Sequence, residues 1–154
     1  MGILDWAGRM VGNGDAQLVA ARAFLVKAQR GEVADLLAGW YEHRGFQVFR
    51  WPAGGVVDIE LRRERSRLIV TLEHLDDIRV TDVRVQEVAR TRLALGARSA
   101  ILITAGTFTW AAQECASDAG VELLDHEDLA HLVASALSLS GKSSRHMELA
   151  RGAA

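Results

Sequence analysis

The sequence predicts an α/β protein with a mixed central sheet of about five strands, flanked by helices and preceded by an N-terminal helix. Stretches with helical spacing of apolar residues alternate with short apolar runs, in the order α-α-β-β-β-α-β-α-β-α. The length is the second observation, because 154 residues, 49% of them apolar, suffice for one buried core but not for two domains. We therefore expect a helical arm over residues 1–31, one domain over 32–137 and a flexible tail over 138–154.

Two helices are expected first. The first begins at Asp15, which is a suitable N-cap residue, and its apolar positions recur at helical spacing until Gly31, which can end it. The second helix turns the apolar residues between Val33 and Tyr41 inward and stops at Gly45.

The apolar period then changes from helical to alternating. We expect strands over residues 46–51, 57–62 and 68–75, joined by a turn rich in glycine and then by a charged hairpin turn. In the third strand, alternation places Leu72 on one face and Thr71 and Glu73 on the other.

The second half of the chain alternates helices with strands. We expect a helix over residues 82–95, a strand over 100–104, a helix over 109–119, a strand over 121–124 and a last helix from Asp125 to Leu137. The strand over 100–104 is too apolar to face water and therefore suits the middle of the sheet.

The charge balance excludes a strong global field. Eighteen basic and twenty acidic residues give a net charge of −2, so binding to nucleic acid requires a local patch. Sixteen of the basic residues are arginine, and the only lysines are Lys27 and Lys142. The single cysteine excludes an internal disulfide and favours a cytoplasmic protein, and no apolar run reaches the ~20 residues that span a membrane.

Three carboxylates lie close together on the predicted meander. Asp58 and Glu60 share a strand face at period two, and Glu73 is on the neighbouring strand. Convergent carboxylates are hard ligands for Mg²⁺, which activates water and stabilises a phosphodiester transition state. The alternative is a solvated strand face, because such faces commonly carry Asp and Glu.

A longer pattern surrounds these residues, and its parts occur in a fixed order. They are Arg44–Val48, Gly54–Ile59, Leu68–Val70, Val83–Glu87, Ala100–Thr104, Phe108–Ala112 and Gly120–Leu124. From Trp40 to Val133, the chain resembles the Mrr-type (type IV) restriction endonuclease domain, a branch of the PD-(D/E)XK nuclease superfamily.

The resemblance implies a metal-binding aspartate at Asp58, followed on the next strand by an acidic or amide residue and a lysine. The corresponding positions here carry Thr71 and Glu73, so the catalytic set Asp58, Thr71 and Glu73 is degenerate. Glu73 has the opposite charge to the lysine that polarises the attacking water. A reduced metal site would consist of Asp58, Glu73 and Glu60, and Lys27 is a remote substitute for the lysine.

DNA binding can survive the loss of cleavage. Residues 44–98 hold eleven arginines and eight acidic residues, whereas residues 111–132 hold six acidic residues and no lysine or arginine. The expected DNA-binding residues are Arg62, Arg63, Arg65, Arg67, Arg84, Arg90 and Arg92. The alternative is that these arginines are ordinary solubilising charges.

The primary hypothesis is a DNA-binding protein with an Mrr-like fold and impaired cleavage, a pseudoenzyme. The first rival is an active Mg²⁺-dependent endonuclease that uses Asp58 and Glu73, with an arginine or Lys27 in place of the lysine. The second rival is a protein-interaction module that no longer binds DNA. DNA is the expected partner, a homodimer or a protein partner is possible in each case, and no cofactor is needed unless cleavage survives.

Overall fold

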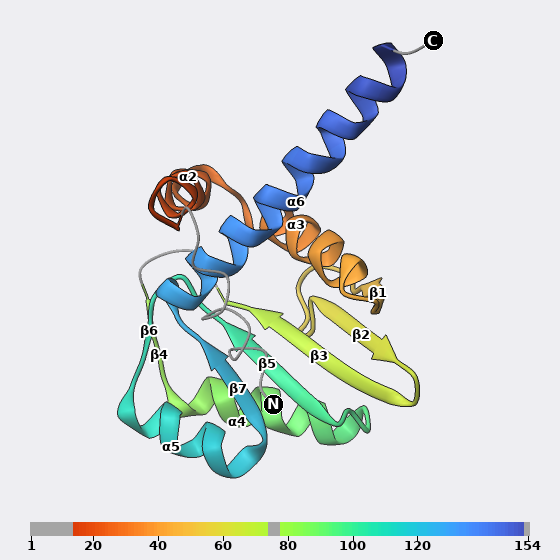
Figure 1. Ribbon diagram of the computed structural model, residues 1–154. Helices are drawn as coiled ribbons and strands as arrows, with labels where there is room; N and C mark the ends of the chain where they lie inside the picture. The colour runs from red at the N-terminus through yellow and green to blue at the C-terminus, as the bar shows by residue number, and fades with distance from the viewer. Residues whose placement is uncertain (1–13, 74–77, 153–154) are drawn as a thin grey trace.

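Five strands form one mixed sheet in the computed structural model, which describes residues 14–73 and 78–152, with residues 142–152 described as backbone only (Figure 1). The strands are β1 (Gln47–Arg50), β2 (Ile59–Arg63), β3 (Ser66–Leu72), β5 (Ser99–Ile103) and β7 (Val121–Leu124), in the spatial order β1-β2-β3-β5-β7. The pairs β1–β2 and β2–β3 are antiparallel, and β3–β5 and β5–β7 are parallel. The predicted fold class is confirmed.

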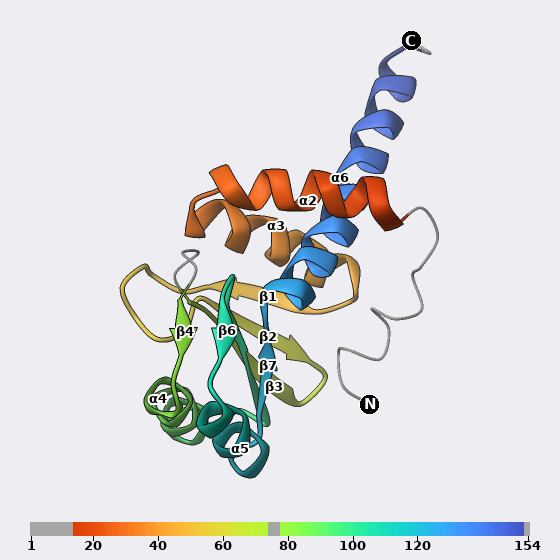
Figure 2. The same ribbon diagram turned by 90° about the vertical axis from the view of Figure 1, so that its left-hand side faces the viewer.

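Helices cover both faces of this sheet (Figure 2). They are α2 (Gly14–Lys27), α3 (Arg30–His43), α4 (Asp82–Ala94), α5 (Trp110–Ala119) and α6 (His126–Gly152). Helices α4 and α5 lie on one face and connect the parallel strands, as crossover helices do. Helices α3 and α6 lie on the other face, and α2 packs outside them against α6.

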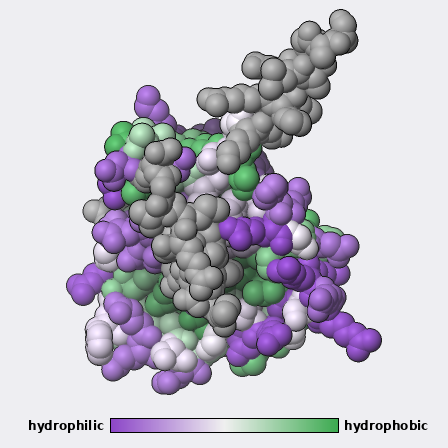
Figure 3. All heavy atoms as spheres, viewed as in Figure 1, coloured by the Kyte–Doolittle hydropathy of each residue, from purple (hydrophilic) through white to green (hydrophobic). Residues whose placement is uncertain are grey.

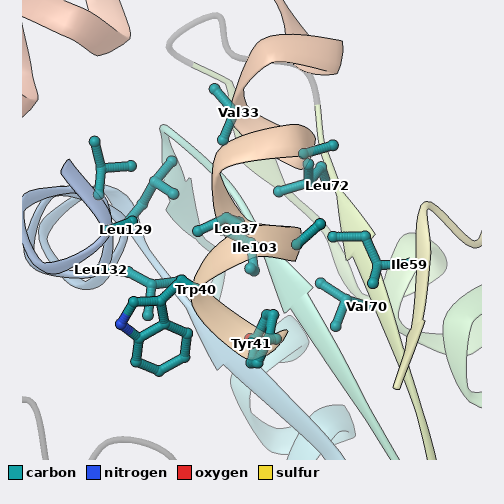
Figure 4. Packing of buried hydrophobic residues seen from close by; sticks show 14 of the residues in the cluster. Val33, Leu37, Trp40, Tyr41, Ile59, Val70, Leu72, Ile103, Leu129 and Leu132 are labelled. Atoms are coloured by element: carbon teal, nitrogen blue, oxygen red, sulfur yellow. The ribbon is translucent and has the colours of Figure 1, made fainter. Parts of the chain in front are cut away.

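Alternation along β3 divides the interior into two cores. Val70 and Leu72 point toward α3 and α6, where they join Tyr41 and Leu129 in the larger cluster (Figure 4). Ile69 points the other way, into the cluster that α4 and α5 cover. Thr71 and Glu73 share the parity of Ile69, so they belong to the α4 side of the sheet.

The break between the first two helices lies earlier than the sequence suggests. Helix α2 ends at Lys27 and α3 begins at Arg30, so Gly31 lies in the first turn of α3 instead of ending a helix. Gln29 takes the N-cap position with an extended backbone, and its N–H donates to the carboxylate of Glu32 at 2.8 Å. The boundary expected between residues 31 and 32 therefore falls inside α3, and residues 1–13 of the expected arm lie outside the described part of the chain.

Helix α6 extends beyond the point where the sequence suggests a tail. The expected unstructured segment begins at Ser138, but the helix continues to Gly152 and projects from the domain (Figure 1). Leu137 and Leu139 still pack against the core that α2 covers, and the chain beyond them contains no proline to stop the helix.

Two short strands are present that the sequence patterns do not predict. β4 (Arg79–Val80) and β6 (Thr107–Phe108) form a separate parallel pair. Gly106 passes so close to the backbone of Ile78 that an added Cβ would lie 1.8 Å from its carbonyl oxygen. The third strand, expected to reach residue 75, ends at Leu72, and residues 74–77 lie outside the described part. None of the described helices is long and apolar enough to cross a membrane.

Candidate functional site

Asp58 lies at the end of the sheet where β2 begins. Its backbone N–H donates to the carbonyl of Val70 at 3.0 Å, which fixes it beside β3. The side chain is 12% exposed, and both of its oxygens accept a hydrogen bond from Nη2 of Arg30, at 2.8 and 2.7 Å. The N–H of Leu72 also donates to Oδ2 at 2.7 Å. The carboxylate therefore receives three hydrogen bonds from two elements of the protein.

Arg30 is the residue of this site that the sequence patterns do not identify. It is the first residue of α3, its side chain is 32% exposed, and its Nε is buried without a hydrogen-bond partner in the described part of the chain. Arginine is far commoner than lysine in this sequence, which makes an arginine the expected substitute for the missing lysine. Arg30 and Asp58 are 28 residues apart, however, so no local sequence pattern predicts that they pair.

Glu73, at the lysine position, is tied to a different layer of the fold. Its N–H donates to the carbonyl of Ile103 at 2.8 Å, and its carboxylate accepts a hydrogen bond from Arg84 on α4. Arg84 also donates to Glu87 at 2.7 Å. Partial burial by itself lowers the pKa of the Arg84 guanidinium. The carboxylates of Glu87 and Glu73 raise it by more, so the net shift of this pKa is upward. Glu73 is thus one member of a partly buried ion-pair network.

Asp58 and Glu73 are bound by arginines of two different helices. Asp58 is bound by Arg30 of α3, whereas Glu73 is bound by Arg84 of α4. These two helices cover different faces (Figure 2). The two predicted metal ligands are therefore engaged in separate ion pairs.

Glu60 is also separate from Asp58. Glu60 is opposite Ile69 in the β2–β3 register, so it shares the α4 face with that residue. It is buried and forms ion pairs with Arg62 at 2.5 Å and Arg67 at 3.7 Å. The expected common face of Asp58 and Glu60 is not observed, because Asp58 precedes the regular strand and alternation does not extend to it.

Thr71 is the third predicted catalytic position, and it is fully buried. Its hydroxyl oxygen has no hydrogen-bond partner among the residues that the structure describes. A neutral hydroxyl enclosed in this way adds no charge to the site.

The predicted metal ligands do not fit a Mg²⁺ site of the carboxylate type. Each predicted carboxylate has its own arginine: Asp58 has Arg30, Glu60 has Arg62, and Glu73 has Arg84. Within residues 14–73 and 78–141, no three His, Cys, Asp or Glu side chains are grouped closely enough to hold a metal ion. A hard divalent cation prefers several oxygen ligands in one place, and these oxygens are dispersed.

Most of the predicted DNA-binding arginines have partners within the protein. Arg62 stacks over Phe49, 4.5 Å from the ring centroid, and Arg63 stacks over Phe46 at 5.2 Å. Arg67 donates to the carbonyl of Leu95 at 2.8 Å. These contacts join β2 to β1 and its approach, and β3 to the end of α4.

The remaining predicted arginines lie on the hairpin tip and on α4. Arg92 donates to the carbonyls of Ala97 and Arg98, so it closes the connection from α4 to β5. Arg65 and Arg90 are exposed. Hydrophilic side chains gather over the β2–β3 hairpin edge, on the right of Figure 3.

A small cavity of about 140 Å³ adjoins Asp58. Its lining includes Arg30, Trp51 and Gly54, together with Arg50, which is paired with Asp35. A larger cavity of about 710 Å³ lies between α2, α3 and α6, and neither Asp58 nor Glu73 lines it. Of these two cavities, the smaller is therefore the one that belongs to the candidate site.

Comparison with known proteins agrees with this fold. The chain is similar to AspBHI, a DNA modification-dependent restriction endonuclease (17% identity, TM-score 0.53, 79% of this chain and 35% of that one). It is also similar to MspJI restriction endonuclease in complex with a 27-mer oligonucleotide (18%, 0.50, 80% and 32%) and to protein AF1548 of unknown function (16%, 0.51, 63% and 64%). The chain thus spans about a third of the length of the two endonucleases and 64% of AF1548.

No curated protein matches the chain. The family model Mrr_cat, described as restriction endonuclease, matches residues 25–133, which is more than half of the sequence. This stretch runs from the end of α2 into α6 and includes the whole sheet. The chain therefore belongs to the Mrr-type restriction endonuclease family.

Proposed function

We propose that this protein binds DNA through a nuclease fold in which phosphodiester cleavage is impaired. The observation that carries the proposal is the placement of Glu73. It occupies the lysine position of the family motif, it carries the opposite charge, and its carboxylate is bound by Arg84 of α4, whereas Asp58 is bound by Arg30 of α3. The group that would polarise an attacking water beside Asp58 is therefore missing from its usual strand.

A second candidate is an active Mg²⁺-dependent endonuclease in which an arginine replaces the lysine. Arg30 favours this candidate, because it places a positive group in contact with Asp58. The same contact counts against it, since Arg30 and the Leu72 N–H occupy the oxygens that a metal ion would use. We therefore rank cleavage below binding.

The proposed DNA surface includes the hairpin tip and the end of the sheet near Asp58. The tip residues Arg63 and Arg65 are exposed. The register places Arg63 five residues beyond Asp58, which is roughly 17 Å along an extended strand. Arg30 and Arg50 lie near the other end of this surface. Arginine suits phosphate because its planar fork donates two parallel hydrogen bonds.

Binding is tested by fluorescence anisotropy with a labelled DNA duplex over a range of salt concentrations. We expect the affinity to fall with salt. The double variant Arg63→Ala/Arg65→Ala should reduce the slope of log K against log salt by about 0.9 for each phosphate that the protein no longer neutralises. Arg22→Ala is the matched control, because Arg22 is exposed on α2, outside the proposed surface. Salt-independent affinity, or an equal weakening in both variants, would contradict the proposed surface.

Cleavage is tested by nicking of supercoiled plasmid with Mg²⁺ or Mn²⁺, alongside Asp58→Ala. The proposal expects the wild-type protein and this variant to give the same background of nicked product. Nicking that disappears in Asp58→Ala supports the second candidate instead. If neither binding nor nicking occurs, the protein-interaction module is the remaining hypothesis.

A further inference from the structure

We propose that the guanidinium of Arg30 is a built-in counter-cation of Asp58, which takes the place of a divalent metal ion and keeps this site free of metal. The inference deepens the proposed function and rests on it for its relevance to DNA. It predicts a property that can be measured without DNA: Asp58 binds a divalent cation only after Arg30 is removed.

The hydrogen bonds of Asp58 are the first argument. A carboxylate offers about four lone-pair positions. Nη2 of Arg30 lies 2.8 Å from Oδ1 and 2.7 Å from Oδ2, and the N–H of Leu72 lies 2.7 Å from Oδ2. Hydrogen bonds at these distances leave little of the carboxylate available to a metal ion, which would also lie next to a fixed positive charge.

The position of the other carboxylates is the second argument. Glu60 and Glu73 are bound to their own arginines on the α4 face of the sheet, so neither adds an oxygen ligand beside Asp58. A cation at Asp58 would have one carboxylate to neutralise it and one guanidinium to repel it. The guanidinium already matches the single negative charge of Asp58.

The backbone fixes Arg30 in this position. The helix break before α3 makes Arg30 the first helical residue, and Ala34, which is one turn further along α3, is buried against the core. The Nε of Arg30 is buried, so part of the side chain is enclosed although 32% of it remains exposed. A side chain that is held by its own helix loses little additional freedom when it pairs with Asp58.

The Arg84–Glu73 pair provides a matched control for this experiment. Arg84 is also a helix residue with a partly buried guanidinium, and it also binds a carboxylate near the end of the sheet. Its pair is shared with Glu87 and lies on the other face. Removing Arg84 therefore frees the carboxylate of Glu73, whose side chain is about as buried as that of Asp58, while Arg30 still binds Asp58.

The test is a titration with Mn²⁺ as the probe, in which free Mn²⁺ is followed by electron paramagnetic resonance in the absence of DNA. The proteins are the wild type, Arg30→Met, Arg84→Met, Asp58→Asn and the double variant Arg30→Met/Asp58→Asn. We expect the wild type and Asp58→Asn to give the same weak curve. Arg30→Met should bind at least about tenfold more tightly, and the double variant should lose this gain.

Two results would overturn the inference. The first is saturable Mn²⁺ binding by the wild-type protein that Asp58→Asn abolishes. The second is a folded Arg30→Met that binds no more Mn²⁺ than the wild type, or one whose gain the double variant keeps. Circular dichroism establishes folding, and if Arg30→Met does not fold, Arg30→Gln replaces it. Its neutral side chain removes the positive charge beside Asp58 but keeps a hydrogen-bond donor, so it should give a gain where the inference holds and none where it fails.

This design separates the inference from the proposed function. Loss of DNA binding in the anisotropy assay would contradict the proposed function and leave the Mn²⁺ curves unchanged. An Asp58-dependent Mn²⁺ site in the wild type would contradict the inference even if DNA binding is retained.

Discussion

The pair between Arg30 and Asp58 should also contribute measurably to the stability of the fold, because it joins α3 to the end of the sheet. The perturbation is Asp58→Ala, which removes the acceptor of three hydrogen bonds. It leaves the guanidinium of Arg30 and the N–H of Leu72 without their partner. Arg30→Met is the complementary variant, since it removes the charge but keeps an apolar side chain of similar length.

The expected cost follows from the burial of the two partners. A hydrogen bond to a charged group contributes about 1.5–3 kcal/mol, and breaking a fully buried ion pair costs about 3–5 kcal/mol. Arg30 is 32% exposed, so water can hydrogen-bond to part of the guanidinium once Asp58 is removed. We therefore expect Asp58→Ala to lower the free energy of unfolding by about 2–3 kcal/mol. For a chain of this length, this corresponds to a decrease in Tm of roughly 5–10 °C.

The assay is urea unfolding of the wild type, both single variants and the double variant, with the free energies combined in a double-mutant cycle. We expect a coupling energy of about 1 kcal/mol or more, because the two side chains touch. Additive free energies within about 0.3 kcal/mol would refute the reasoning, as would a change below about 0.5 kcal/mol in Asp58→Ala. Either result would mean that the pair is not maintained in solution.

Further predictions concern the two cores and the short β4–β6 pair. Gly106→Ala should lower the free energy of unfolding in urea by about 3 kcal/mol or more, because the added Cβ would meet the backbone carbonyl of Ile78. Gly39→Ala on α3 is the control: its Cβ meets nothing within 4 Å, so it should raise the free energy of unfolding by about 0.5–1 kcal/mol. Equal effects of the two substitutions would contradict the packing described. Tyr41→Phe should be neutral or stabilising near pH 7, because the buried hydroxyl has no hydrogen-bond partner within residues 14–73 and 78–141. Burial, assisted by the charge of Glu122, raises the pKa of Tyr41 above its usual range. The wild type should therefore lose stability as the pH rises above about 10, where the tyrosine ionises in the unfolded chain first, and Tyr41→Phe should lose less. Identical profiles of Tm against pH for the two proteins would contradict this prediction.

Local sequence patterns predict most of the helices and strands, because apolar periodicity and capping residues act within a single element. The apolar run around Ile101 forms a central strand, and the signals at Thr109 and Gly120 mark the start and the end of α5: the hydroxyl of Thr109 accepts from the N–H of Ala112, and Gly120 has a left-handed φ of 68°. The length of α6 is not predicted, because Leu137 and Leu139 are held by α2, which is distant in sequence.

The candidate site is predicted less completely, for the same reason. The sequence gives the residue types of the site, including the absence of lysine between residues 28 and 141, but Asp58 lies just before β2 and Glu73 just after β3, not within the strands as expected. What alternation cannot predict is that Asp58 leaves the strand pattern and turns to Arg30, while Glu73 turns to Arg84. Ion pairs between separate elements depend on the assembled fold, and strand periodicity carries no information about them.

The central claim is that this nuclease fold binds DNA with its own arginines and without a metal ion. The most direct test compares the affinity of the wild-type protein for one DNA duplex in EDTA and in Mg²⁺, at matched ionic strength. The account predicts that Mg²⁺ does not tighten binding but weakens it as a competitor for phosphate, by the same factor in the wild type and in Asp58→Asn. Binding that requires Mg²⁺, and that Asp58→Asn abolishes, would contradict it.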